Sequence, residues 1–257
     1  MASKRILYIN PGEKDALLDG QVREFLTPHL ADTGSTLDVV SMAKTPQHLE
    51  YHAYHAIIAP EILREVVKGE QAGYDGCVIG CFDDPCLDAA REVCTRMAVT
   101  APCEASVHLA ATLGARFSVI IGKPVWEIRM RRRIEDYVGV NRLASFRNLG
   151  LGVLDFQADR QRTEHLIKQA VTQAVEQDGA EAVVLGCTME FGFFRELQES
   201  CGVPIIDACL APLKYLELLM HISDCCGWRH SKRGGWGSPP SGELAGWGLS
   251  EKLGFTL

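Results

Sequence analysis

Two segments of the chain repeat one pattern, in which a glycine, an acidic residue and an apolar run lead to a Gly-Cys pair. The first segment is GYDGCVIGC, residues 73–81, and the second is GAEAVVLGC, residues 179–187. Each is followed by a helical segment and then by a short strand near a proline, Pro102 or Pro204. Such self-similarity indicates two related structural units. The repeat therefore predicts two lobes, each with a Gly-Cys turn at the carboxyl end of a strand.

Short apolar runs alternate along the chain with segments of helical period. Apolar strands separated by helices are typical of parallel sheets covered on both faces. We therefore expect an α/β fold of two pseudo-symmetric lobes, with mainly parallel sheets flanked by helices. The active site is expected in the interlobe cleft, because ligands of open α/β sheets bind at the carboxyl ends of strands. The expected strands are residues 5–10, 36–42, 76–80, 116–122, 182–186 and 203–207, and the clearest helices are residues 53–68, 85–97, 125–138, 163–177, 190–200 and 212–222.

The predicted lobes are not continuous in sequence. Residues 1–105 together with 205–227 are assigned to the first lobe, and residues 106–204 to the second. Residues 228–257 form a C-terminal tail that is rich in Gly, Ser and Pro but also contains three tryptophans. We expect this tail to be partly docked, against a neighbouring subunit of a homo-oligomer; a disordered terminus is the alternative.

Composition limits the kinds of partner. A chain of 257 residues with 47% hydrophobic residues can bury a substantial core. Its formal net charge of -7 argues against nucleic acid and against a membrane, because both attract clustered Lys and Arg. The basic run RMRRR, residues 129–133, is interpreted as the solvated face of a helix. A small molecule is the expected partner.

Targeting and cysteine content favour a cytoplasmic protein. No apolar run approaches the roughly 18 residues of a membrane span, and the hydrophobic stretch near the first residue is too short for a signal peptide. The ten cysteines are fewer than a disulfide scaffold of this length contains, so we expect reduced thiols.

The cysteine spacing does not suit a metal. Cys77 and Cys81 lie four residues apart along a strand and its exit, which separates them by roughly 13 Å. No C-x-x-C motif occurs, and the adjacent Cys225 and Cys226 lack a second pair. We therefore expect no metal site. Four cysteines are interpreted as buried packing residues: Cys77, Cys94, Cys201 and Cys209.

Cys81 and Cys187 differ because each ends a strand. Asp84 and Pro85 have the pattern of an N-cap and a first helical residue, which predicts backbone N–H groups and a helix dipole directed at the Cys81 thiol. These features lower a thiol pKa. Two opposed thiols suit proton transfer at a carbon stereocentre without a cofactor, since one removes a proton while the other delivers one. Structural cysteines are the alternative.

Five segments of the chain, including both Gly-Cys turns, resemble a known protein family. The segments ILYINP, GCFDDPCLDAARE, PCEAS, LGCTMEF and GVPIID resemble the aspartate/glutamate/hydantoin racemase superfamily, in particular its hydantoin racemase branch, from Arg5 to about Pro240. The resemblance implies no metal or cofactor, catalytic Cys81 and Cys187, and racemisation at C5 of a 5-substituted hydantoin, a cyclic ureide. The backbone near Phe82, Asp83 and Thr188 would then bind the enolate oxygen.

The resemblance also suggests further substrate contacts and exposes departures. Glu104 aligns with a glutamate of the family site, a salt-bridged surface acid being the alternative, and Asn10 and Met189 complete the expected substrate-binding set. The segments that depart from the family pattern are Gly12 with Glu13, Gly122 to Pro124, and Thr188 to Glu190. They leave allantoin or an amino acid of the Asp/Glu type as alternative substrates.

Two other reaction classes stay open. An arylmalonate-decarboxylase-like lyase would use one cysteine as proton donor, so the presence of both Cys81 and Cys187 argues against it. A non-enzymatic binding or redox-sensing protein would use exposed thiols without proton exchange at carbon.

Overall fold

Two four-stranded parallel sheets form the framework of the protein. The computed structural model describes residues 3–256, and they divide into two units. The first unit contains residues 3–79, 85–100 and 214–256, and the second contains residues 80–84 and 101–213. The predicted α/β class with two lobes is confirmed.

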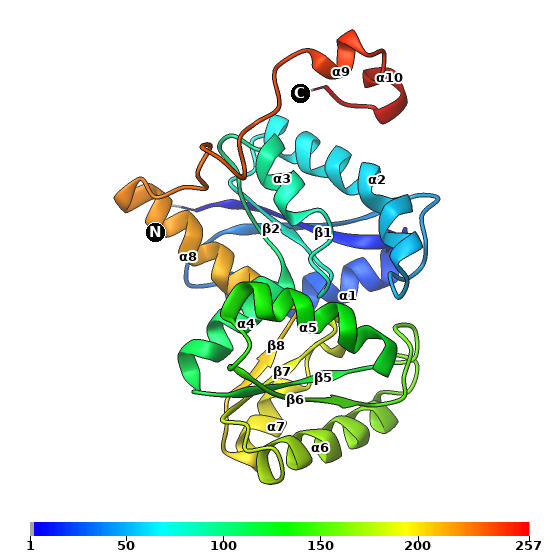
Figure 1. Cartoon of the computed structure of the whole chain (residues 1–257), viewed down its shortest axis with the longest axis vertical. Coiled ribbons are helices and arrows are strands. Elements are labelled where there is room, and N and C mark those ends of the chain that lie inside the picture. Colours follow the sequence, from blue (N-terminus) through cyan, green and yellow to red (C-terminus); the bar gives the residue numbers. More distant parts are fainter. Residues whose placement is uncertain (1–2, 257) are drawn as a thin grey trace. The chain divides into compact units, whose positions relative to one another are not determined.

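The first sheet has the strand order β2-β1-β3-β4. Helices α2 and α3 cover one face of this sheet, and α1 and α8 cover the other (Figure 1). The strands are β1 (Arg5–Glu13), β2 (Thr36–Met42), β3 (Gly76–Ile79) and β4 (Ala98–Thr100). The helices are α1 (Ala16–Leu26), the 3-10 turn η1 (Thr27–Leu30), α2 (His52–Gln71), α3 (Leu87–Val93) and α8 (Ala211–Cys226), whose first three residues belong to the second unit.

The second sheet has the order β6-β5-β7-β8, which is the same arrangement. Helices α4 and α5 lie on one face and α6 and α7 on the other (Figure 1). The strands are β5 (Phe117–Ile121), β6 (Leu143–Asn148), β7 (Ala182–Leu185) and β8 (Ile205–Asp207). The helices are α4 (Pro102–Leu113), α5 (Pro124–Val138), α6 (Arg160–Glu176), the 3-10 turn η2 (Thr188–Glu190) and α7 (Phe194–Cys201).

The glycines of the repeated pattern allow close packing at the sheets. A Cβ atom on Gly76 would lie 2.8 Å from Leu216 Cδ2 and 2.9 Å from Met220 Sδ, so the missing side chain lets α8 approach β3. A Cβ atom on Gly186 would lie 2.6 Å from the carbonyl oxygen of Ile120. A larger residue before Cys187 would therefore push the turn away from β5.

Some predicted boundaries differ from the observed ones. Residues 205–213 were expected in the first lobe, but they belong to the second unit because β8 pairs with β7. Residues 80–84 and 101–105 also belong to the second unit. The tail was expected as a separate segment, yet it belongs with the first unit. Of the cysteines expected to be buried, Cys201 is only partly so.

Helices α1 and α4 and strand β6 are among the elements that the sequence interpretation lacked. Helix α4 is buried around most of its circumference, so its sequence lacks the polar stripe of an amphipathic helix. Strand β6 is an edge strand with one buried residue, and it therefore lacks an apolar run. Helix α1 contains Gly20 and exposes Leu17, both of which weaken the helical pattern.

The C-terminal tail docks on its own chain. Lys232 Nζ donates to the carbonyl oxygens of Arg91 and Glu92 at the end of α3. Trp236 Nε1 donates to Asp88 Oδ1 at 2.9 Å, and the Arg91 guanidinium carbon lies 4.7 Å from the centroid of the Trp236 ring. The tail also forms two short helices, α9 (Glu243–Gly246) and α10 (Ser250–Leu253). The tail is thus docked, as expected, and the contacts described are with α3 of its own chain. Docking against a neighbouring subunit stays a prediction.

Across residues 3–256, no helix is both long and apolar enough to cross a membrane.

Removing the tail's contacts with α3 should destabilise the protein. Trp236→Ala removes one hydrogen bond and one cation–π contact, so we expect a loss of about 1–2 kcal/mol in the free energy of unfolding. Urea denaturation measures this value. Trp247→Ala is the matched control, since the Trp247 side chain is 64% exposed. Equal effects of the two substitutions would contradict the docked arrangement.

Candidate active site

The two Gly-Cys turns occupy equivalent places in the two sheets. Cys81 follows β3 and Cys187 follows β7, and each of these strands lies beside the strand where the chain order reverses, β1 or β5. In open parallel sheets this switch point, at the carboxyl ends of the strands, is where ligands bind. The repeat in the sequence therefore marks two equivalent strand ends.

Both turns belong to the second unit. Residues 80–84 leave the first sheet and group with the second unit, which also contains Cys187. The Thr188 hydroxyl donates to the carbonyl oxygen of Gly80 at 3.3 Å and so connects the two turns. A charge on Cys81 raises the pKa of Cys187, so the thiols are close enough to interact electrostatically. The structure thus brings together Cys81 and Cys187, the two cysteines that the sequence predicted as a pair.

Asp84 anchors the Cys81 turn from within the protein. It has no exposed surface and a positive φ of 46°, which is unfavourable for a residue other than glycine. Its Oδ1 accepts the N–H of Cys103 at 2.8 Å, and its Oδ2 accepts the N–H of Glu104 at 2.8 Å and the Tyr137 hydroxyl at 3.0 Å. Burial raises the pKa of Asp84 to about 7, although the two N–H groups oppose the shift.

The predicted capping role of Asp84 is corrected by these contacts. Helix α3 begins at Leu87, and its N-cap, Cys86, makes no side-chain capping bond. Asp84 instead caps the first turn of α4, where Ala101 has no side-chain oxygen for the purpose. The carboxylate accepts two of the N–H groups that a helix leaves unbonded at its start. Asp84 therefore joins the Cys81 turn to α4.

Asp83 forms an ion pair with Arg129 of α5. The Arg129 side chain is 15% exposed and the Asp83 side chain 5%. The Asp83 backbone N–H donates to the Cys81 sulfur, a bond that favours the thiolate. Arg133, one turn further along α5, makes a side-chain hydrogen bond with Tyr137. Part of the basic run thus supports the Cys81 turn, and its interpretation as a solvated helix face is wrong for Arg129.

A spacing signal for these residues existed in the sequence. Arg129, Arg133 and Tyr137 recur every four residues, beside the buried positions Trp126 and Met130. Residues four apart share one face of a helix. The spacing indicates a polar stripe next to the core, which the charge of the run obscured.

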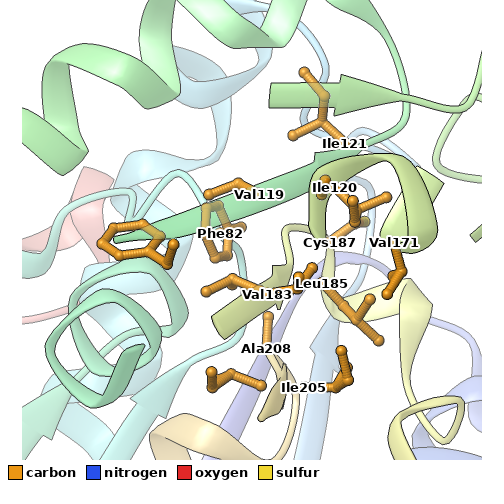
Figure 2. Close-up of a cluster of buried hydrophobic side chains, with 14 of the residues drawn as sticks. Phe82, Val119, Ile120, Ile121, Val171, Val183, Leu185, Cys187, Ile205 and Ala208 are labelled. Atoms are coloured by element: carbon orange, nitrogen blue, oxygen red, sulfur yellow. The ribbon is translucent and has the colours of Figure 1, made fainter. Parts of the chain in front are cut away.

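Cys187 belongs to an apolar cluster around β5 and β7 (Figure 2). It is 9% exposed. It caps the 3-10 turn η2: its Sγ accepts the backbone N–H of Glu190, while Glu190 Oε2 accepts the Cys187 N–H at 3.2 Å. The Met189 N–H also favours the Cys187 thiolate. The polar groups around this sulfur are therefore backbone donors and one buried carboxyl group.

The predicted lowering of the thiol pKa values is wrong in direction. Burial raises the pKa of Cys81, and the charges of Asp83 and Asp84 add to the increase. Burial also raises the pKa of Cys187 well above its ordinary value, and Glu190 adds to that increase. The opposing helix effect is small, because α3 is seven residues long and η2 only three. Both cysteines are therefore protonated at neutral pH in the free protein.

The remaining predicted residues have different environments. Glu104 is 7% exposed in the first turn of α4, so it is not a surface acid. Phe82 is 2% exposed and packs in the apolar cluster (Figure 2), which leaves its backbone rather than its ring for a ligand. The Met189 carbonyl accepts the Gln157 amide at 2.6 Å. Asn10 belongs to the first unit, where its Nδ2 donates to Asp19 Oδ1 at 3.1 Å.

The described part of the chain contains no group of three or more His, Cys, Asp or Glu side chains that could hold a metal ion.

Comparison with known proteins gives consistent similarities. The sequence profile described as Asp/Glu/hydantoin racemase matches residues 6–216. A hydantoin racemase of Pseudomonas sp. (strain NS671) is 34% identical over 218 residues, which are 85% of this chain and 86% of that protein. A hydantoin racemase of Paenarthrobacter aurescens is 32% identical over 240 residues, which are 91% and 97% of the two chains.

A solved structure shows the same architecture. The allantoin racemase from Klebsiella pneumoniae has a TM-score of 0.84 and 28% sequence identity, and the match covers 93% of this chain and 94% of that chain. The similarity therefore extends over both sheets.

Loss of Arg129 should destabilise the protein by leaving Asp83 buried without its counter-ion. We expect Arg129→Met to lower the free energy of unfolding by about 3 kcal/mol, and Asp83→Asn in the same chain to restore much of the loss. Urea denaturation distinguishes these variants. Arg132→Met, at an exposed position of the same basic run, is the control and should be neutral. A neutral Arg129→Met would contradict the importance of this ion pair.

Proposed function

The chain belongs to the Asp/Glu/hydantoin racemase family and is a racemase, and we propose that it racemises 5-substituted hydantoins by proton transfer between Cys81 and Cys187. The observation that carries the proposal is the pairing of two Gly-Cys turns in one unit, with a hydrogen bond between the turns and an electrostatic interaction between the thiols. Hydantoin racemases among the relatives favour this substrate class.

The proposed reaction balances with one proton removed and one delivered. The thiolate of one cysteine removes the proton from C5 of the ring, so that an S–H bond forms as the C5–H bond breaks. The electron pair left on C5 delocalises onto the adjacent C4 carbonyl. The thiol of the other cysteine then donates its proton to the opposite face of C5. After this turnover the second cysteine is the thiolate and the first is the thiol. In that state the enzyme can convert the product enantiomer back to the original one. The chemistry as written uses no metal or cofactor.

Some backbone N–H groups would stabilise the thiolates, and others would stabilise the enolate oxygen. The Asp83 N–H stabilises the Cys81 thiolate, and the Glu190 and Met189 N–H groups stabilise that of Cys187. The N–H groups of Phe82 and Thr188 are then proposed as donors to the enolate oxygen. Preorganised donors of this kind stabilise charge that develops only during the reaction. Asn10, Glu104 and Met189 remain proposed substrate contacts.

The raised thiol pKa values have two opposite effects on rate. They reduce the fraction of enzyme that carries a thiolate, and they make that thiolate a stronger base toward a carbon acid. The apolar cluster to which Cys187 belongs also limits access of water, which would otherwise compete for the carbanion. A weakly populated but strong base is consistent with proton abstraction from carbon.

Allantoin is the second candidate substrate. The structural similarity to the Klebsiella pneumoniae allantoin racemase favours it. Allantoin is itself a hydantoin with a ureido group at C5, so the same two thiols would act on the same carbon. Racemisation assays with allantoin and with a 5-alkyl or 5-arylmethyl hydantoin, followed by optical rotation, separate these substrates.

Replacing each cysteine singly should separate proton exchange from racemisation. In Cys81→Ser or Cys187→Ser the hydroxyl is too weak a base to replace the thiolate, so we expect interconversion of enantiomers to be lost. The remaining cysteine still faces one side of the ring and can return deuterium from solvent to that side. Each variant should therefore exchange mainly one enantiomer, with opposite preferences, as proton NMR in deuterated water would show.

The exposed Cys225 provides the control for this experiment. Cys225→Ser should racemise as the wild type does, because the Cys225 thiol lies outside both turns. Racemisation near the wild-type rate by either turn variant would refute the two-base mechanism. Exchange of the same enantiomer by both variants would show that the thiols do not face opposite sides of the ring.

The racemisation rate should rise with pH through the neutral range. Both thiols have raised pKa values, so the thiolate is the minor form at pH 7. As long as it remains the minor form, its population grows about tenfold per pH unit. We expect kcat/KM to increase from pH 6 to pH 9, measured as the initial change in optical rotation. A rate that is flat or falling over this range would show that the reacting base is already ionised near pH 6.

A further inference from the structure

Glu190 is a fully buried acid that the reaction described above does not use. It ends the 3-10 turn η2, three residues after Cys187, and its exposed fraction is 0%. Glutamate side chains are almost never completely buried unless they have a specific partner. Within residues 3–256, the Oε1 atom of Glu190 has no hydrogen-bond partner.

Glu190 and Cys187 hold each other through reciprocal hydrogen bonds. The Glu190 Oε2 atom accepts the Cys187 backbone N–H at 3.2 Å, and the Cys187 Sγ atom accepts the Glu190 backbone N–H. In such a capping box each side chain satisfies the backbone donor of the other residue. The carboxyl group thus helps to fix the orientation of the thiol.

The charge state of Glu190 follows from its neighbours. Burial raises its pKa well above the ordinary value, and the negative charge of Asp207 raises it further. Asp207 is the acid better suited to be ionised. Burial raises its pKa to about 6, and the N–H groups of Gly192, Cys209 and Leu210, which its oxygens accept, oppose the increase. Asp207 is therefore the acid of this pair that ionises more readily, and burial favours the neutral form of Glu190.

Other charges reach the same group of residues. Arg160 of α6 acts on Asp207 and favours its ionised form. Cys81 and Asp83 act on Cys187, and Asp83 is neutralised in part by Arg129. The Cys81 turn thus has an acid with a cationic partner, whereas the Cys187 turn has an acid whose neutral form is favoured by burial.

We propose that Glu190 is a positioning residue for Cys187, whose neutral carboxyl group fixes the turn and permits a thiolate, and whose ionisation at alkaline pH opposes that thiolate. The proposal rests on the proposed function, in which Cys187 exchanges protons with the substrate. It assigns to Glu190 an effect that depends on pH and is confined to one of the two cysteines.

Alkylation of each cysteine tests this assignment without a substrate. Iodoacetamide reacts with the thiolate, so the pH dependence of its rate at each cysteine, followed by mass spectrometry of peptides, reports the thiolate population. Glu190→Gln keeps an oxygen for the Cys187 N–H and cannot ionise. The Cys187 rates of this variant and of the wild type should coincide near pH 7. At alkaline pH the variant should react about fivefold faster, because one neighbouring negative charge is absent.

Two controls test whether the faster alkylation of Cys187 comes from the lost charge of Glu190 or from a change in the whole protein. Cys81 should keep its wild-type rate in Glu190→Gln, and the exposed acid Glu196 of α7 should have no effect as Glu196→Gln. If Glu190→Gln does not fold, Glu190→Met offers similar volume without a charge and should show the same divergence at alkaline pH. Superimposable Cys187 profiles, a difference that is constant with pH, or an equal change at Cys81 would each overturn the proposal.

The test also distinguishes failure of the two proposals. The expected alkylation profiles, found in a protein that racemises neither hydantoins nor allantoin, would retain the coupling of Glu190 to Cys187 and reject the proposed reaction. Racemisation by a protein whose Cys187 profile ignores Glu190 would retain the reaction and reject the positioning role.

Discussion

The arrangement of the candidate site depends on the buried carboxylate of Asp84. Its two oxygens accept the first N–H groups of α4 and the hydroxyl of Tyr137 on α5, so one side chain connects the Cys81 turn with two helices. The residue adopts a positive φ, which only tight surrounding contacts make tolerable. Cys81, three residues earlier, is positioned by the same turn, since the Asp84 N–H donates to its carbonyl oxygen at 2.9 Å.

The two turns have the same backbone position but different electrostatics. Near Cys81 the acid is Asp83, whose charge is balanced by Arg129. Near Cys187 the acid is Glu190, whose neutral form is favoured by burial and by the charge of Asp207. A racemase treats two mirror-image substrates, yet its chain is built of L-residues and its lobes are only similar. The pKa values of both thiols are raised by burial, and different acidic neighbours, Asp83 and Glu190, add to the increase.

The sequence predicted those features that depend on local pattern. Strands β3, β5 and β7 are buried along their whole length, so their apolar runs were clear, and the Gly-Cys repeat located both turns. The same reasoning could not find contacts between distant residues. The Asp84 carboxylate bonds to N–H groups about twenty positions further along, and no local pattern distinguishes this from capping of the next helix. The thiol pKa values were predicted in the wrong direction for a related reason, because desolvation depends on the whole fold.

Burying these acids has a cost in stability that changes with pH. A carboxyl group whose pKa is raised on folding binds its proton more tightly in the folded chain than in the unfolded one. Its contribution to stability is fully present below the ordinary pKa near 4, and it is lost as the pH rises through about 6 for Asp207 and about 7 for Asp84. The thiols follow the same rule at higher pH, because their pKa values are also raised. The alkaline conditions that would supply thiolate for the proposed proton transfer are therefore those in which the buried groups stabilise the fold least. The backbone donors to Asp84 and Asp207 offset part of that loss.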